Sequence, residues 1–217
     1  MRAFHPGLED LPREMAVFPL SGALLLPEGR LPLNIFEPRY LAMVEDSMAT
    51  GRMFGMIQAE PGAPRGASGP GLYTIGCLGR LSSFSETDDG RYLITLSGVI
   101  RYRVAEEIDM QRGYRRVRAD YTPYLRDLVT EKPQVDRDAL LGAIRPYFLA
   151  QGIEANWAAI EETSDSMLIT TLSMVCPFEV PEKQALLEAP DATQRATMLV
   201  ALMQMGAHGE SPDQRPS

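Results

Sequence analysis

The chain has 217 residues, which is enough for one large domain or two small ones. Its hydrophobic content of 45% is typical of a globular protein that buries a core. The formal net charge of −8 opposes general binding of polyanions, because phosphate backbones attract clustered positive charge.

Neither a targeting signal nor a membrane span is predicted. Residues 1–14 contain acidic side chains and no apolar run, unlike a signal peptide, and no segment approaches the ~20 apolar residues that a membrane span needs. Cys77 and Cys176 each lie in an apolar run, so we expect buried free thiols rather than a disulfide. These observations predict a cytoplasmic protein.

The first half of the chain has mainly the pattern of β-strands. Alternating residues predict a strand over 31–36, and Pro38 followed by an apolar i, i+3, i+7 stripe predicts a helix over 38–51. The stretch 60–71 is rich in Gly, Pro and Ala and indicates a mobile loop. Further strands are expected at about 76–85, 92–104 and 114–124.

The strand at 92–104 has the clearest alternation. Gly98 interrupts its apolar face, which indicates a bulge or a sharp bend. Asp88-Asp89-Gly90 precedes it and is typical of a hairpin turn.

The second half changes to the helical period. We expect helices at about 140–148, 156–162, 164–175, 181–189 and 191–206. The pattern therefore predicts an α+β chain. Its expected parts are an N-terminal tail (1–13), a β-rich lobe (14–125), a helical lobe (126–206) and a disordered tail (207–217).

No arrangement of residues suited to catalysis is found. Lys132 and Lys183, the two lysines, lie in polar contexts and are expected to be solvated, which opposes a Ser–Lys dyad. His5 and His208 lie in the terminal segments, where a fixed geometry is not expected. The cysteines and histidines lack zinc-ligand spacing. We therefore expect no enzymatic activity, no cofactor and no metal.

Several blocks of sequence stand out in order along the chain. They are Phe18-Pro19-Leu20, Leu31-Pro32-Leu33-Asn34-Ile35-Phe36-Glu37-Pro38-Arg39-Tyr40, Gly76-Cys77, Asp89-Gly90-Arg91, Leu96-Ser97-Gly98-Val99-Ile100-Arg101-Tyr102, and Lys183-Gln184-Ala185-Leu186-Leu187-Glu188 followed by Arg195. Together they resemble the N-terminal substrate-binding domain of Lon proteases.

The resemblance implies a PUA-like β pseudo-barrel with one inserted helix, followed by a C-terminal helical bundle. In Lon proteases this domain precedes an AAA+ ATPase and a Ser–Lys peptidase. This sequence has no G-x-x-x-x-G-K-[ST] loop and ends after the expected helical lobe. The resemblance is therefore to stand-alone members of the family, and it does not imply proteolytic activity.

The junction between the strand at 31–36 and the following helix is a candidate binding surface, formed by Phe36, Glu37, Arg39, Tyr40 and Met43. The alternative is structural: Glu37 and Arg39 form a charge pair at the corner, and Tyr40 packs beneath them. We favour the structural interpretation.

Two residue clusters suggest other binding modes. Arginines at 101, 103, 112, 115, 116 and 118 are the main argument for RNA binding by a PUA-like fold. Strand alternation separates Arg115 from Arg116 and Arg118, and the whole chain is acidic, so RNA binding is disfavoured. Methionines at 167, 174, 198, 203 and 205 either line an adaptable groove for peptides or fill the core, and core filling is favoured.

Our leading hypothesis is a non-catalytic module that recognises unfolded or peptide-like protein segments, in the manner of an adaptor or a chaperone-like binder, with a protease or chaperone as partner. The alternative is an RNA- or small-ligand-binding PUA-like domain, and a hydrolase with an unrecognised site is a third hypothesis. Nucleic acid and membranes are not the expected partners.

Overall fold

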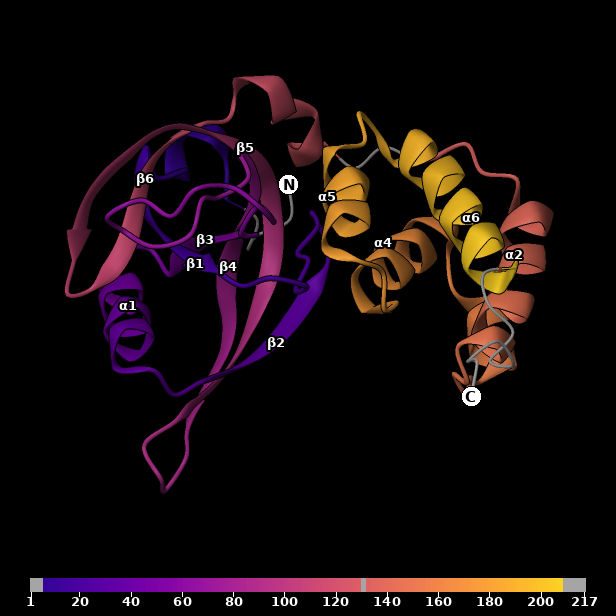
Figure 1. Cartoon of the computed structure of the whole chain (residues 1–217), viewed down its shortest axis with the longest axis horizontal. Helices are drawn as coiled ribbons and strands as arrows, with labels where there is room; N and C mark the ends of the chain where they lie inside the picture. The colour runs from indigo at the N-terminus through magenta and orange to yellow at the C-terminus, as the bar shows by residue number, and fades with distance from the viewer. Residues whose placement is uncertain (1–5, 130–131, 209–217) are drawn as a thin grey trace, which may run out of the picture. The chain divides into compact units, whose positions relative to one another are not determined.

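The computed structural model of the chain describes residues 6–129 and 132–208 (Figure 1). These residues form two compact units. The first contains residues 6–129 and Phe178–Leu187, and the second contains residues 132–177 and 188–208.

The first unit is built on one sheet of six strands. They are β1 (Glu14–Pro19), β2 (Arg30–Ile35), β3 (Met53–Ile57), β4 (Ile75–Glu86), β5 (Tyr92–Gln111) and β6 (Tyr114–Asp120). The order across the sheet is β2-β5-β4-β3-β1-β6, and β6 also pairs with β5. β1 and β3 are parallel, while the other pairs are antiparallel. Helix α1 (Pro38–Ala49) lies between β2 and β3 in the chain, as expected.

The longest strand, β5, changes its partner along its length. It pairs with β4 from Tyr92 to Arg103 and with β6 from Arg103 to Gln111. Because β4 and β6 use different halves of β5, the sheet curls back on itself without becoming a closed barrel. The expected strand ended at residue 104, since the alternation stops in the acidic stretch that follows.

The curled sheet surrounds the main apolar core of the first unit. Its buried residues include Met15, Val17, Ile57, Leu78, Ile100, Tyr102 and Val117. Leu11 also packs in this core, although the sequence predicted a tail up to residue 13. A short 3-10 helix, η1 (Leu8–Asp10), precedes it, and a second, η2 (Thr122–Leu128), replaces the expected end of the strand at 114–124.

Helix α5 (Val180–Glu188) belongs to the first unit through buried polar contacts. Gln58 Nε2 donates to Gln184 Oε1 (3.1 Å), and Gln184 Nε2 donates to the Ile75 carbonyl (3.1 Å). Lys183 Nζ donates to the Gly22 carbonyl (2.6 Å). The expectation that Lys183 is solvated is therefore wrong, because this lysine is buried and its ammonium group has a backbone acceptor. The expected helical lobe (126–206) had included this helix.

The second unit contains four helices among the described residues: α2 (Arg137–Ala150), α3 (Trp157–Glu162), α4 (Asp165–Val175) and α6 (Ala192–His208). Asp136 and Asn156 cap α2 and α3 by accepting from the backbone N–H three residues later. The expected helical bundle is confirmed. α6 continues past the expected end at residue 206, so the predicted disordered tail (207–217) begins inside a helix, and residues 209–217 lie outside the described ranges.

Both cysteines are free and buried, as predicted. Gly98 also has the expected role. The pairing of β4 with β5 shifts register between Leu78 and Gly79, opposite Gly98. The segment before β2 approaches closely here: Gly98 N donates to the Gly29 carbonyl (2.9 Å), and Glu28 N donates to the Gly98 carbonyl (3.0 Å). A Cβ at residue 98 would overlap the Leu26 carbonyl.

We therefore predict that Gly98→Ala destabilises the chain by about 2 kcal/mol or more, because the backbone must move to admit the methyl group. Gly142→Ala is the matched control, since this glycine lies exposed in α2 with no atom within 4 Å of the added Cβ. The control is expected to stabilise by up to about 1 kcal/mol. Urea unfolding measures both, and equal effects of the two substitutions would contradict the prediction.

Candidate functional site

The corner between β2 and α1 holds the five residues proposed from the sequence. Arg39 Nε and Nη2 both donate to Glu37 Oε2, at 3.0 and 2.8 Å. The Arg39 guanidinium also lies over the Tyr40 ring, 4.5 Å from its centroid. Tyr40 is buried against Phe18, with ring centroids 4.3 Å apart, and this burial raises the pKa of its phenol.

These contacts match the structural interpretation of the corner. Met43 is completely buried, and Tyr40 is nearly so, which leaves them inside the protein. Phe36 is 62% exposed, and Glu37 and Arg39 are about half exposed as a pair. A role of Phe36, Glu37 and Arg39 in binding stays a prediction.

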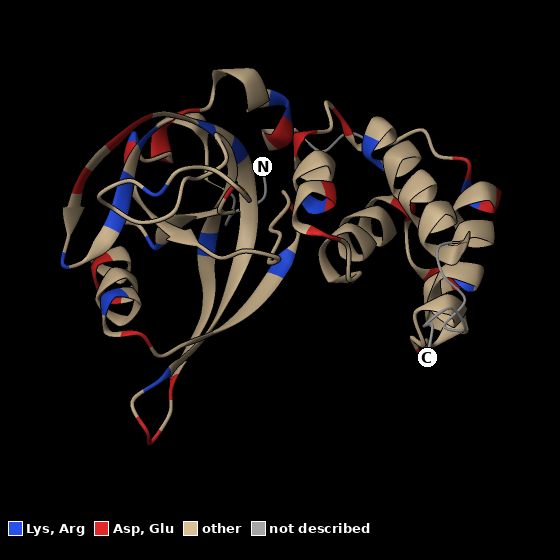
Figure 2. Ribbon diagram, in the orientation of Figure 1, with Lys and Arg blue, Asp and Glu red and all other residues tan. Residues whose placement is uncertain are grey.

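The arginines between residues 101 and 118 do not form a free basic surface. Arg101 is buried and forms an ion pair with Asp127 (2.8 Å), while Arg112 contacts Glu45 and Asp46 on α1, each at 2.8 Å. The other ion pairs join Arg115 to Glu107, Arg116 to Glu14, and Arg118 to Glu14 and Glu106. Figure 2 shows the two signs of charge interleaved over β5, β6 and α1.

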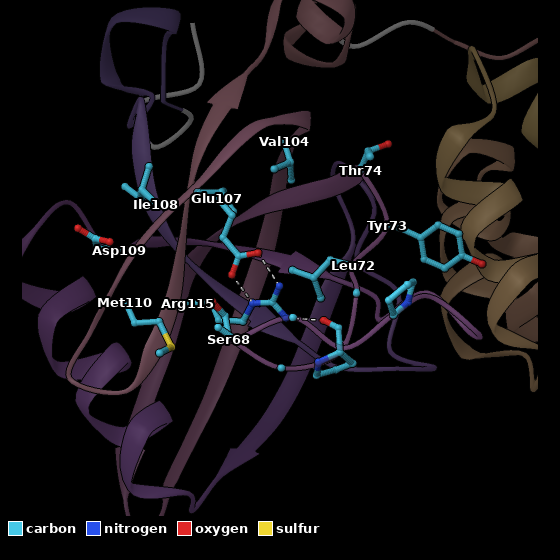
Figure 3. A pocket seen from close by; sticks show the side chains of 17 residues that line it. Ser68, Leu72, Tyr73, Thr74, Val104, Glu107, Ile108, Asp109, Met110 and Arg115 are labelled. Atoms are coloured by element: carbon cyan, nitrogen blue, oxygen red, sulfur yellow. Dashed lines mark hydrogen bonds and ion pairs between the residues drawn. The ribbon is translucent and has the colours of Figure 1, made fainter.

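A pocket of about 590 Å³ lies beside the second half of β5 (Figure 3). Its lining comes from three segments: Pro64 with residues 66–74, the β5 residues Val104 and 107–110, and Arg115 and Val117 of β6. Apolar side chains of Leu72, Val104, Met110 and Val117 contribute to the lining. The volume is in the range of ligand sites in proteins, roughly 300–1,000 Å³.

Arg115 connects the three segments that line this pocket. Its Nε and Nη2 donate to the two carboxylate oxygens of Glu107, at 2.7 and 2.6 Å, and its Nη1 donates to the Pro70 carbonyl (2.7 Å). Figure 3 shows the Glu107 and Arg115 side chains pointing toward one another. Hydrogen bonds from the Arg115 guanidinium keep the pKa of the Glu107 carboxyl below its ordinary value. The pocket thus contains a buried cation that is already neutralised.

The segment at 60–71, predicted as a mobile loop, covers one side of the pocket and contains no helix or strand, but backbone hydrogen bonds join its parts. Glu60 N donates to the Gly71 carbonyl (3.0 Å), and Gly66 and Gly69 exchange backbone hydrogen bonds (2.8 and 3.2 Å). The segment is therefore a short hairpin. Its attachment to Arg115 through Pro70 joins it to β6.

The sequence pointed to Arg115 only as one of a cluster of arginines, and it did not identify Glu107 as a site residue. The side chains of the adjacent Glu106 and Glu107 diverge, since Glu106 contacts Arg118 while Glu107 turns to Arg115. The signal that could have found the pair is Gly113, which is typical of a hairpin turn and brings the acidic end of β5 beside the arginines of β6.

In the described ranges, no three His, Cys, Asp or Glu side chains gather in a group that could hold a metal ion. Within residues 6–129 and 132–208, no helix has both the length and the apolar character needed to cross a bilayer.

Comparison with known proteins decides the family. The profile of the ATP-dependent protease La (LON) substrate-binding domain matches residues 14–205. The chain belongs to this family. Among its relatives, Lon protease 2 of Myxococcus xanthus is 25% identical over 210 residues, which cover 91% of this chain and 24% of the relative. The LON substrate-binding domain described here therefore spans about a quarter of that protease.

Solved structures agree on the fold. A Lon N-terminal domain protein from Xanthomonas campestris has a TM-score of 0.61 and 21% identity, covering 87% of this chain and 97% of that one. The N-terminal domain of a Mycobacterium avium complex Lon protease has a TM-score of 0.59 and 16% identity, covering 88% and 97%. The LON substrate-binding domain fold thus extends over both units of the chain.

We predict that Glu107→Gln destabilises the protein near neutral pH by about 1 to 2 kcal/mol, because Arg115 then stays buried without its anion. The pKa of Glu107 is lowered in the folded state, so its stabilising effect is present above the unfolded pKa and is lost as the pH falls through the folded pKa. The difference from wild type should therefore shrink below about pH 4.5.

Urea unfolding at several pH values measures this difference. Glu106→Gln is the control, since its ion pair with Arg118 is exposed to solvent and is expected to contribute little to stability. A Glu107→Gln effect that stays constant between neutral pH and about pH 3 would refute the ion-pair explanation.

Proposed function

We propose that this LON substrate-binding domain recognises extended or unfolded segments of other proteins without cleaving them. The observation that carries the proposal is the pocket beside β5, where apolar side chains and backbone face the open space and the one buried arginine is already paired. Such a lining suits polypeptide better than a small anion, because no unpaired cation is left to bind the anion's charge.

The family supports the same proposal, because its members are named as substrate-binding domains of a protease. By this proposal the chain presents clients to a separate protease or chaperone in the cytoplasm, as an adaptor. RNA binding is less well supported. Five of the six arginines that suggested it, at 101, 112, 115, 116 and 118, form ion pairs, so few cations are available for phosphates.

We predict that the chain binds fluorescein-labelled β-casein, an unfolded protein, and leaves it intact with or without ATP. Fluorescence anisotropy measures binding and gel electrophoresis measures cleavage. Affinity should depend less steeply on salt than RNA binding would, since the pocket arginine is already paired and an exposed charge contact contributes little. Absence of binding would refute the proposal. Cleavage would also refute it, as would tighter, strongly salt-dependent binding of a single-stranded RNA.

Two matched variants locate the casein contact. Met110 lines the pocket and is 50% exposed, whereas Met205 on α6 is 61% exposed in the second unit. Met110→Glu should weaken casein binding by about fivefold, corresponding to the loss of about 1 kcal/mol of apolar contact. Met205→Glu should leave binding unchanged. Equal effects of the two substitutions would place the contact outside the pocket.

A further inference from the structure

The second half of β5 has a free edge. Val104 N donates to the Thr74 carbonyl (2.7 Å), and this is the last backbone hydrogen bond on the side of β5 that faces β4. From Ala105 to Gln111 only β6 pairs with β5. No other segment among residues 6–129 and 132–208 forms a backbone hydrogen bond to this edge.

An unpaired strand edge presents a row of N–H and C=O groups and is a ready template for another strand. Proteins usually cover such edges or keep them short. Here the nearest segment is the hairpin at residues 60–71, and it is attached to the Arg115 side chain rather than to the β5 backbone. The pocket occupies the space between the hairpin and β5, and residues 107–110 line it.

The side chains along this edge indicate the chemistry of an occupant. Residues 105–111 include Glu106, Glu107 and Asp109 and no basic residue. Glu106 and Glu107 have arginine partners on β6, but Asp109 is exposed and has no ion pair within the described residues. Figure 3 shows Asp109 turned away from Arg115, whereas Leu72 lies close to this arginine. The edge thus offers one exposed carboxylate without an ion pair within the described residues, that of Asp109, next to a pocket whose lining is partly apolar.

We propose that the free edge of β5 at residues 105–110 takes an extended polypeptide segment as an added strand, and that it selects segments in which apolar and basic residues alternate. In a strand, successive side chains point to opposite faces. Apolar side chains would enter the pocket, while basic ones would lie on the face of Asp109. The inference rests on the proposed function and names the binding mode and the class of client.

Hydrogen–deuterium exchange tests the added strand directly. The probe is a labelled ten-residue peptide of alternating valine and lysine, added to the full chain. The peptide should slow exchange by about tenfold or more at those amides of residues 105–110 that point away from β6, because only these groups gain hydrogen-bond partners. Residues 92–97 are the internal control, since β2 and β4 already pair with them on both sides. Unchanged exchange at 105–110 with bound peptide would overturn the proposal.

Backbone methylation separates strand addition from side-chain binding. Two further peptides have the same sequence, with N-methyl groups on one or the other alternate set of amides. An added strand donates to β5 through only one of these sets, so one methylated peptide should lose binding and the other should keep it. Equal affinity of the two peptides would overturn the strand-addition mode.

Charge variants test the preference for basic segments. Asp109→Lys should weaken binding of the valine–lysine peptide by about fivefold, because an exposed attraction becomes a repulsion. Asp88→Lys, in the exposed β4–β5 turn, makes the same change in net charge and should have no effect. A valine–glutamate peptide should bind more weakly than the valine–lysine peptide. If the acidic peptide binds equally well, the charge preference is wrong.

The casein experiment keeps the two proposals distinguishable. If casein binds and the valine–lysine peptide does not, strand addition at β5 is overturned while recognition of unfolded protein stands. If neither binds, both proposals fail.

Discussion

The change of partner along β5 determines most of the first unit. A strand of 20 residues is long for a small sheet. Its first half pairs with β4 and its second half with β6, and Arg103 takes part in both pairings. Because β4 leaves β5 where β6 begins to pair with it, the sheet can curl around a core without closing. The same geometry leaves an edge of β5 without a strand, and the pocket lies beside that edge.

The arrangement of charge follows from the antiparallel pairing of β5 with β6. β5 contributes the carboxylates of Glu106 and Glu107. On β6, Arg118 lies directly opposite Glu106, while Arg115 reaches Glu107 from a position two residues away from Val117, the direct partner of Glu107. Each pair joins two strands that are close in sequence, so the charges neutralise one another locally. A chain that looks basic between residues 101 and 118 therefore folds into a surface with little net attraction for phosphate. This compensation depends on pairing in three dimensions, which a count of arginines does not show.

Much of the fold was predictable because alternation is strong where one face of a strand is buried. The strands at 31–36 and 92–104 and the helix beginning at Pro38 have this regular pattern, and the structure contains them. Other elements lack such a pattern. Residues 105–111 are acidic and carry no apolar alternation, and β3 is a short run that is apolar on both faces.

The candidate site was harder to predict than the fold. The hairpin at 60–71 is distant in sequence from residues 107–110 and Arg115. It is connected to them by the hydrogen bond from Arg115 to the Pro70 carbonyl, and no local sequence pattern indicates this contact. Lys183 was misjudged for a related reason. Its carbonyl acceptor lies at Gly22, more than a hundred residues away in the chain, so nothing local indicates that the lysine is buried.

The position of α5 has a consequence for the order in which the protein can form during synthesis. The helices of the second unit up to Pro177 are inserted into the first unit, whose last segment is Phe178–Leu187. Gln58 bonds to Gln184, and Arg101 bonds to the Leu187 carbonyl. More than eighty residues must be translated after Gln58 and Arg101 before these partners exist. A ribosome that adds about 5–20 residues per second would hold the nascent sheet in this unfinished state for several seconds. During part of its synthesis, the sheet of this substrate-binding domain thus exposes polar groups that are buried in the finished fold. The sheet is completed only when residues far downstream have been translated.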